Sequence, residues 1–217
     1  AAAVGEVPIG AVVVRAGEIV ARAHNRRELD QDPSAHAEFA ALCAAARSLG
    51  RWRLSDCTVY VTLEPCSHWG RTPPCALAIV EHRIGRVVTS VADPNPQVAG
   101  RGLKMIRDAG IEVTEGVRSK EGWLSNRGFL TRMTTGRPWV RMKCAATLDG
   151  RTAFPDGRSQ WITGPAARED SQYWRAVSGA VVTGIGTVLA DNPKMTVRLP
   201  DLSLIHISEP TRRRGIS

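Results

Sequence analysis

The pattern of apolar and polar positions divides the first half of the chain into short strands and helices. Runs rich in β-branched apolar residues, such as 9–14 (IGAVVV), are typical of buried strands. An alanine-rich helix is expected to run to about residue 48, capped by Asp32 or Ser34. Further strands are predicted over 18–23, 57–63, 86–91 and 111–117, and further helices over 75–83 and 102–109. This alternation of strands and helices predicts an α/β sandwich.

The pattern changes after residue 117. Residues 119–132 are predicted to form a connecting helix, and the turn-forming sequence TTGRP at 134–138 marks a boundary. Beyond it, the runs 139–145 and 180–184 predict strands of a second α/β unit. This unit is short for an independent domain, so we expect it to be incomplete. The predicted divisions are a first α/β domain 1–117, a connecting helix and linker 118–137, a partial second domain 138–200 and a tail 201–217.

Both ends of the chain stand out from the rest. Residues 1–4 (AAAV) resemble the last turn of a helix whose start is missing. Residues 201–217 have neither helical nor alternating periodicity, and they contain three consecutive arginines. We expect this segment to be a foreign tail derived from a cloning sequence. The alternative is a genuine, disordered basic tail.

Composition and charge argue against a membrane protein and against a secreted protein. No apolar run approaches the ~20 residues needed to cross a bilayer, and residues 1–14 lack the pattern of a signal peptide. The five cysteines form an odd set, which indicates a reducing compartment and therefore the cytoplasm. The net charge of the chain is +8, and all of the positive excess lies after residue 66, because residues 1–66 sum to −1 and residues 67–217 to +9. A basic balance favours anionic partners, nucleic acid or small phosphates, although solvated surface arginines explain it equally well.

The strongest chemical pattern is His36-Ala37-Glu38 followed by two cysteines that come after prolines, Cys66 and Cys75. Three nitrogen or sulfur ligands and an open position for water are typical of catalytic zinc. Glu38 lies two residues after His36 on the opening turn of a helix, so its carboxylate can lie beside the open position. There it can accept a proton from an activated water and pass it to a leaving nitrogen. The pattern therefore predicts hydrolytic deamination.

The spacing of the two cysteines is unusual for this chemistry. Cys75 is predicted at a helix start, where the helix dipole favours the thiolate that binds metal. The zinc deaminase signature reads H-x-E…P-C-x-x-C, but here eight residues separate Cys66 from Cys75. Two alternatives remain. One is a structural zinc site with His68 as the fourth ligand, and the other is a pair of buried cysteines with a chance histidine.

Long motifs after residue 57 carry a resemblance to one family. They are TVYVTLEPCSHWGRTPPC at 58–75, DPNP at 93–96, KCAATLDGRTA at 143–153, SQWIT at 159–163 and GTVLADNP at 186–193. These residues resemble the bifunctional deaminase/reductase family of riboflavin biosynthesis over 58–200. The resemblance implies a cytidine-deaminase-like α/β/α sandwich followed by a truncated dihydrofolate-reductase-like α/β domain.

The resemblance also implies two reactions. The deaminase would remove the 2-amino group of a phosphoribosylated diaminopyrimidinone, with zinc on His36, Cys66 and Cys75 and with Glu38 as the catalytic proton carrier. The reductase would use NADPH to reduce 5-amino-6-(5-phosphoribosylamino)uracil. The positions that match NADP contacts are Ala145, Trp161, Thr187 and Asp191, and those that match substrate contacts are Ser159, Arg175, Met195 and Arg198. Because the family's reductase fold continues beyond Arg198, we expect reductase activity to be impaired.

Residues 4–66 resemble a second family, the tRNA-specific adenosine deaminases. The matching stretches are 4–14, 24–26, 32–38 and 60–66. The alternative function is therefore adenosine-to-inosine editing of a tRNA wobble base, with Asn25 near the pocket mouth, although the negative charge of this segment argues against an RNA partner. Two further hypotheses are a joined chain of two related proteins and a zinc-stabilised binding module without catalysis. By analogy with related deaminases we expect a homo-oligomer.

Overall fold

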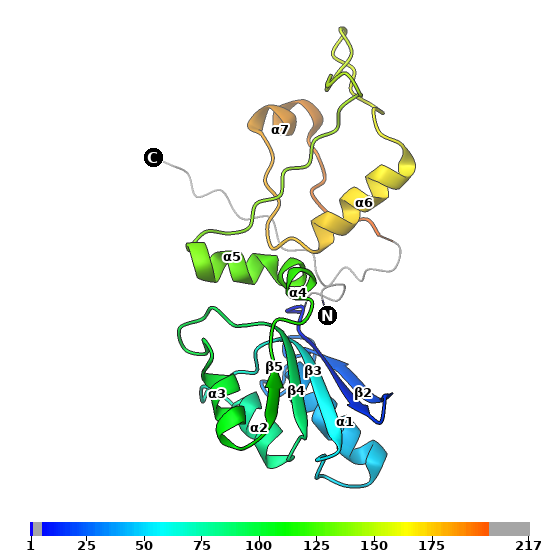
Figure 1. The fold of residues 1–217 in the computed structure, drawn as a ribbon. Coiled ribbons are helices and arrows are strands. Elements are labelled where there is room, and N and C mark those ends of the chain that lie inside the picture. Colours follow the sequence, from blue (N-terminus) through cyan, green and yellow to red (C-terminus); the bar gives the residue numbers. More distant parts are fainter. Residues whose placement is uncertain (2–5, 200–217) are drawn as a thin grey trace. The chain divides into compact units, whose positions relative to one another are not determined.

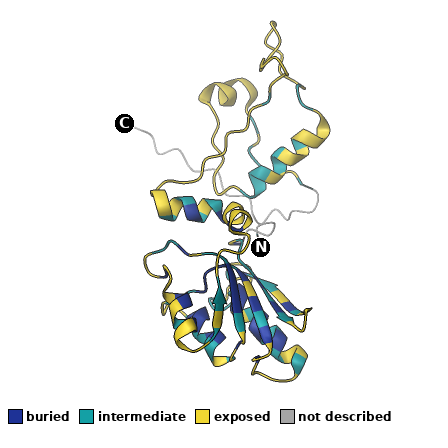
Figure 2. Ribbon diagram, in the orientation of Figure 1, coloured by how far each residue is buried: buried dark blue, intermediate teal, exposed yellow. Residues whose placement is uncertain are grey.

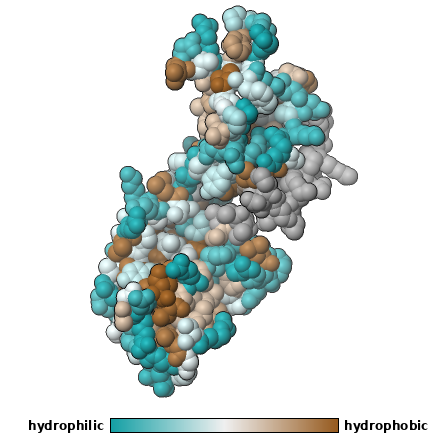
Figure 3. All heavy atoms as spheres, turned by 90° about the vertical axis from the view of Figure 1, so that its right-hand side faces the viewer, coloured by the Kyte–Doolittle hydropathy of each residue, from teal (hydrophilic) through white to brown (hydrophobic). Residues whose placement is uncertain are grey.

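The structure is a computed structural model that describes residue 1 and residues 6–199. The chain separates into two compact units, the first ending at Val140 and the second beginning at Arg141. Each unit is described by itself. Among the described residues, no helix is both long enough and apolar enough to span a membrane. On the face shown in Figure 3, hydrophilic residues cover most of the described surface and hydrophobic residues form smaller groups.

A five-stranded mixed sheet forms the centre of the first unit (Figure 1). Its strands are β1 (Gly10–Arg15), β2 (Glu18–His24), β3 (Cys57–Leu63), β4 (Arg86–Val91) and β5 (Glu112–Thr114), in the spatial order β2-β1-β3-β4-β5. Strand β1 runs antiparallel to both β2 and β3, whereas β3, β4 and β5 are parallel. Strands β1 and β2 form a hairpin. Its two turn residues, Ala16 and Gly17, both adopt positive φ angles, as a tight two-residue turn requires.

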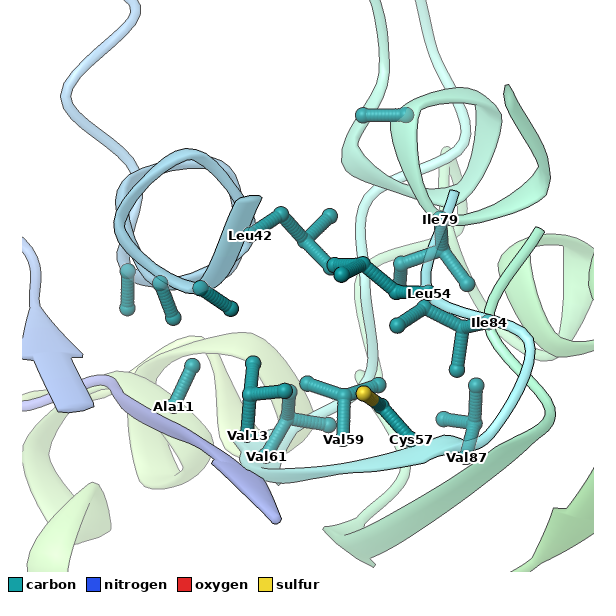
Figure 4. Close-up of a cluster of buried hydrophobic side chains, with 14 of the residues drawn as sticks. Ala11, Val13, Leu42, Leu54, Cys57, Val59, Val61, Ile79, Ile84 and Val87 are labelled. Atoms are coloured by element: carbon teal, nitrogen blue, oxygen red, sulfur yellow. The ribbon is translucent and has the colours of Figure 1, made fainter. Parts of the chain in front are cut away.

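One face of the sheet is covered by three helices. These are α1 (Ala37–Leu49), α2 (Cys75–Glu81) and α3 (Arg101–Asp108). Figure 4 shows the core between α1, α2 and the sheet: Val13, Val59 and Val61 point from the strands toward Leu42 and Ile79. These apolar side chains are buried. Because alternate residues of β3 point into the core between the helices and the sheet, Thr58 and Tyr60 lie on the opposite face of the sheet.

The opposite face is contacted by a fourth helix. Helix α4 (Ser119–Ser125) packs against β4, and a Cβ on Gly122 would meet Ser90 Oγ at 2.2 Å. Ser90 alternates with the core-facing Val87 and Thr89, so α4 lies on the second face of the sheet. Helices on both faces confirm the predicted α/β/α sandwich.

The connecting segment forms two helices, where the sequence predicts a single helix over 119–132. The break lies at Asn126, which has a φ of −112° between α4 and α5 (Arg127–Thr135). Asn126 is buried, and its side-chain amide donates to the backbone carbonyl of Pro8 at 3.1 Å. This tertiary hydrogen bond accounts for the interruption, which the local sequence pattern does not reveal.

The second unit contains two helices, α6 (Pro165–Ala176) and α7 (Ile185–Asp191), and no strand among its described residues 141–199. The predictions of strands over 139–145 and 180–184 are therefore wrong. Met142 and Val182 are 87% and 92% exposed, and exposed residues, drawn yellow in Figure 2, make up most of this unit. An apolar run becomes a strand only when it finds a neighbouring strand and a layer to cover it, and the described part of this unit offers neither.

Candidate metal centre

Three potential metal ligands meet where two helices begin and the central strand ends. His36 is the N-cap of α1, Cys75 is the first residue of α2, and Cys66 lies three residues after β3. One donor atom from each of these side chains lies within 4.8 Å of the other two. The structure thus brings together the three residues that the sequence predicts as ligands.

The local chain path explains why these side chains converge. The predicted caps of α1 are wrong, because Asp32 instead accepts hydrogen bonds from the backbone and the hydroxyl of Ser34, both at 2.7 Å. Helix α1 begins at Ala37, and its N-cap residue His36 makes no side-chain capping hydrogen bond. On the other side, the backbone N–H of Cys75 donates to the Cys66 sulfur at 3.2 Å. A free N–H at a helix start favours a sulfur that carries negative charge.

The pKa values of the two cysteines shift in opposite directions, because the two side chains are hydrogen-bonded to each other. The Cys75 thiol donates to Cys66, which with His36 lowers the pKa of Cys66 to about 4. The same hydrogen bond, together with burial, raises the pKa of Cys75 well above its ordinary value. The hydrogen bond with Cys66 raises the pKa of His36. A metal ion that binds all three atoms would replace these protons, so binding is coupled to proton release.

Glu38 is the one acidic side chain that lies beside these donors on α1. It is 3% exposed, and its Oε2 atom has no hydrogen-bond partner among the described residues. Burial raises the pKa of Glu38 to about 7, and the charge of Cys66 adds to this shift. A carboxyl group with a pKa near neutrality is suited to accept and return a proton in the same cycle.

The donor set fits zinc. Zinc bonds of about 2.1 Å to nitrogen and 2.3 Å to sulfur place tetrahedral ligands roughly 3.5–3.8 Å apart, which is compatible with the observed upper limit of 4.8 Å. His68 is exposed and does not belong to the cluster of ligand atoms found in the described part of the chain. Three ligand residues and a buried acid with one oxygen, Oε2, that has no partner among the described residues therefore favour a catalytic site over a structural one.

A basic hollow that the sequence analysis missed lies next to this centre. It is open to solvent, has a cavity volume of about 80 Å³ and is lined by Arg27, Arg71 and Pro33, with Glu28 and Gln31. Arg27 is close enough to His36 to oppose the rise of its pKa. The available signal was the position of two arginines on the loops that precede His36 and Cys75.

Two buried carboxylates near the ligands were also missed. Glu64 and Asp93 are 3% and 8% exposed. Burial raises the pKa of Asp93, and the charges of Glu64 and Cys66 act in the same direction. The sequence analysis treated the two residues as parts of motifs. The available signal was an acidic residue one or two positions after each of two buried parallel strands, Glu64 after β3 and Asp93 after β4.

The four predicted NADP contacts are not gathered into a site. Trp161 is 70% exposed and lies against the guanidinium of Arg168, while Thr187 and Asp191 are exposed on α7. Ala145 lies in an irregular segment. No hydrogen bond or ring contact joins any two of these four residues in the described part of the unit.

Two of the four predicted substrate contacts, Arg175 and Arg198, share a hydrogen-bond partner. The guanidinium groups of Arg175 and Arg198 both donate to the carbonyl of Lys194, at 3.4 and 3.2 Å. Arg175 also donates to Thr196, so the two arginines flank the segment that carries Met195. Burial and the charge of Arg198 lower the pKa of Arg175. The fourth predicted contact, Ser159, is exposed.

Family comparisons agree with both units. The model of the cytidine and deoxycytidylate deaminase zinc-binding region matches residues 1–91, and the RibD C-terminal domain matches residues 138–212. The second match extends to residue 212, beyond the end predicted for the partial second domain at residue 200. The predicted boundaries of the domains remain predictions. Together with the sheet, the three ligand residues and Glu38, the first match places residues 1–91 in the class of cytidine and deoxycytidylate deaminase zinc-binding regions.

The relatives identify the family within that class. RibD of Escherichia coli K12 is 49% identical over 194 residues, which is 89% of this chain and 50% of the relative. RibD of Bacillus amyloliquefaciens is 46% identical over 94% of this chain and 52% of the relative. The chain belongs to the RibD family, and it spans about half the length of the curated relatives it matches.

Solved structures agree with this assignment. A bifunctional deaminase/reductase from Thermotoga maritima has a TM-score of 0.82 and 42% identity, covering 92% of this chain and 56% of that one. RibD of Acinetobacter baumannii (form 1) has a TM-score of 0.78 and 44% identity, covering 93% of this chain and 55% of that one. A structure from a study of tRNA:A34 deaminases is more distant, with a TM-score of 0.48 and 55% of this chain covered.

The length of these matches bears on the N-terminal segment. The 194 matched residues exceed the 151 that follow Cys66, so the resemblance to RibD extends into residues 1–66. The hypothesis that the chain joins two related proteins stays a prediction.

Proposed function

We propose that this chain hydrolyses an exocyclic amino group from a phosphoribosylated diaminopyrimidine and releases ammonia. The observation that carries the proposal is the buried carboxyl group of Glu38, which lies beside the three ligand residues. Its Oε2 atom has no hydrogen-bond partner among the described residues. The Thermotoga maritima relative is titled a diaminohydroxyphosphoribosylaminopyrimidine deaminase, which supports this substrate.

The residues of the site have separate roles in this reaction. His36, Cys66 and Cys75 would hold zinc, which when bound supplies a Lewis acid that makes water acidic near neutral pH. The Glu38 carboxylate accepts a proton from the attacking water. Because its pKa is about 7, it can then release that proton to the departing amino nitrogen. A carbon–oxygen bond forms, the carbon–nitrogen bond breaks, and ammonia leaves.

The basic hollow supports a phosphorylated substrate. Arg27 and Arg71 both line it, and guanidinium groups bind phosphate oxygens through paired hydrogen bonds. The loops that carry them are joined by a hydrogen bond from the Thr72 hydroxyl to the carbonyl of Pro33, at 3.5 Å. We assign this hollow to the phosphate of the ribosyl group.

The second unit is proposed as part of a reductase. The RibD C-terminal match supports NADPH as its cofactor. The predicted NADP contacts Ala145, Trp161, Thr187 and Asp191 remain a proposal, as do the substrate contacts Ser159, Arg175, Met195 and Arg198. The paired guanidinium groups of Arg175 and Arg198 suit an anionic group. We expect the chain by itself not to reduce the deaminated product, because the predicted NADP contacts are scattered and three of them, Trp161, Thr187 and Asp191, are exposed.

The cytoplasm is the proposed location, because zinc binding requires reduced thiols and all five cysteines are free. Homo-oligomerisation also stays a proposal by analogy with related deaminases.

Ammonia release tests the function directly. The zinc-loaded chain is offered the phosphoribosylated diaminopyrimidine and, in parallel, a tRNA anticodon stem-loop. We expect ammonia from the pyrimidine alone, and about 10²–10⁴-fold slower release from Glu38→Gln with zinc still bound. Release from the stem-loop alone would establish the tRNA alternative, and full activity of Glu38→Gln would remove Glu38 from the mechanism.

A further inference from the structure

We infer that Glu64 is a positioning residue that fixes the Cys66 ligand segment against the loop between β4 and α3. This inference rests on the proposed zinc site. It concerns a buried carboxylate that takes no part in the proton transfer proposed for Glu38 and is not among the clustered ligand atoms.

The hydrogen bonds of Glu64 span both ends of that loop. Its Oε2 accepts the backbone N–H groups of Asp93 at 3.2 Å and Gly100 at 3.0 Å. Its Oε1 accepts those of Gly102 at 3.2 Å and Leu103 at 3.4 Å. A carboxylate can accept at both oxygens at once, whereas an amide has only one accepting oxygen. The carboxylate therefore ties the start and end of residues 93–103 to one point.

That point lies two residues before a metal ligand. The start of α3 also approaches the same segment directly, since a Cβ on Gly102 would meet the Pro65 carbonyl oxygen at 2.0 Å. The hydroxyl of Ser67 donates to the carbonyl of Gln97 at 3.3 Å. Residues 65–67 are thus held against this loop from both sides of Cys66.

The opposite side of Cys66 is fixed by α2. The N–H of Ala76 donates to the Cys66 carbonyl at 3.1 Å, while the N–H of Cys75 donates to its sulfur. The position of this ligand therefore depends on two supports, one from α2 and one from Glu64. Leu103, one of the four partners of Glu64, also belongs to the apolar core, so the test must separate a local change at Cys66 from a general loss of stability.

The test uses Glu64→Gln in the full chain, with the exposed Glu18→Gln as the matched control. The amide keeps the shape of the side chain but turns an N–H₂ group toward two N–H donors. We expect zinc release to a chelator to become at least about tenfold faster in Glu64→Gln, and the visible absorption bands of the cobalt-substituted site to shift. Hydrogen exchange of residues 93–103 should quicken, while the amides of β3 keep their protection. Glu18→Gln should behave as the native chain.

A second variant approaches the contact from the other side. Gly102→Ala keeps the carboxylate but pushes α3 away from Pro65, so it should also release zinc faster and shift the cobalt bands. Native zinc release and native cobalt spectra in both variants would overturn the inference. Faster release with equal loss of protection in β3 would also overturn it, because it would indicate general unfolding. None of these readouts needs turnover, so failure of the proposed deamination is detected separately.

Discussion

The buried carboxyl group of Glu38 makes a quantitative prediction about stability. Its pKa is about 7 in the folded chain, against an ordinary value of 4.5. In metal-free protein between these two pH values, the unfolded chain loses this proton and the folded chain keeps it. The free energy of unfolding therefore falls as the pH rises, and the contribution of this group is lost once the pH exceeds about 7. At about 1.4 kcal/mol per pKa unit, the total loss is roughly 3 kcal/mol.

Glu38→Gln removes this titration while keeping the shape of the side chain. We expect the variant to gain roughly 2–3 kcal/mol relative to the native chain between pH 5 and pH 8. The measurement is urea unfolding of both metal-free proteins, followed by far-ultraviolet circular dichroism at intervals across that range. Glu18→Gln controls for the loss of a carboxylate at an exposed position. A difference between Glu38→Gln and the native chain that stays constant with pH would refute a raised pKa at Glu38.

Three further predictions concern the metal, the substrate and the core. His36→Ala leaves two ligands, so it should lose zinc on dialysis, and chelation of the native chain should abolish ammonia release until zinc is restored. Arg71→Gln should raise KM for the phosphorylated pyrimidine about 10–100-fold with kcat nearly unchanged, whereas the exposed Arg22→Gln should leave both constants as they are. Leu42→Ala empties a fully buried position and should lower the free energy of unfolding by about 2–5 kcal/mol in a urea titration.

The sequence was most informative where chemistry and local pattern coincide. The residue types and helix starts around His36 and Cys75 predicted a metal centre, and the structure places the three donor atoms together. The positions of the strands in the first unit were also predictable, because runs of β-branched residues are separated by turn residues. The ends of the strands were harder to predict, since the strand predicted over 111–117 is only Glu112–Thr114. Its ends depend on pairing with β4 as well as on its own residues.

Other features depend on contacts that no local pattern contains. The break at Asn126 arises from a hydrogen bond to Pro8, more than a hundred residues away. Glu64 reads locally as the end of a strand, and its four backbone partners become visible only when the loop after β4 folds over it. The strands expected in the second unit failed for the same reason, because the described residues supply no neighbouring strand. Pairing is a property of two segments, and the sequence of one does not determine it.

The division between the sheet and its loops has a consequence for how new specificities arise. The metal ligands sit at the starts of α1 and α2 and just beyond β3, whereas Arg27 and Arg71 lie on the connecting loops. Insertions or exchanges in those loops can therefore retune which base or sugar is admitted while the hydrolytic machinery stays in place. A scaffold of this kind is suited to directed evolution by loop grafting, because the loops that carry Arg27 and Arg71 determine which substrates can bind.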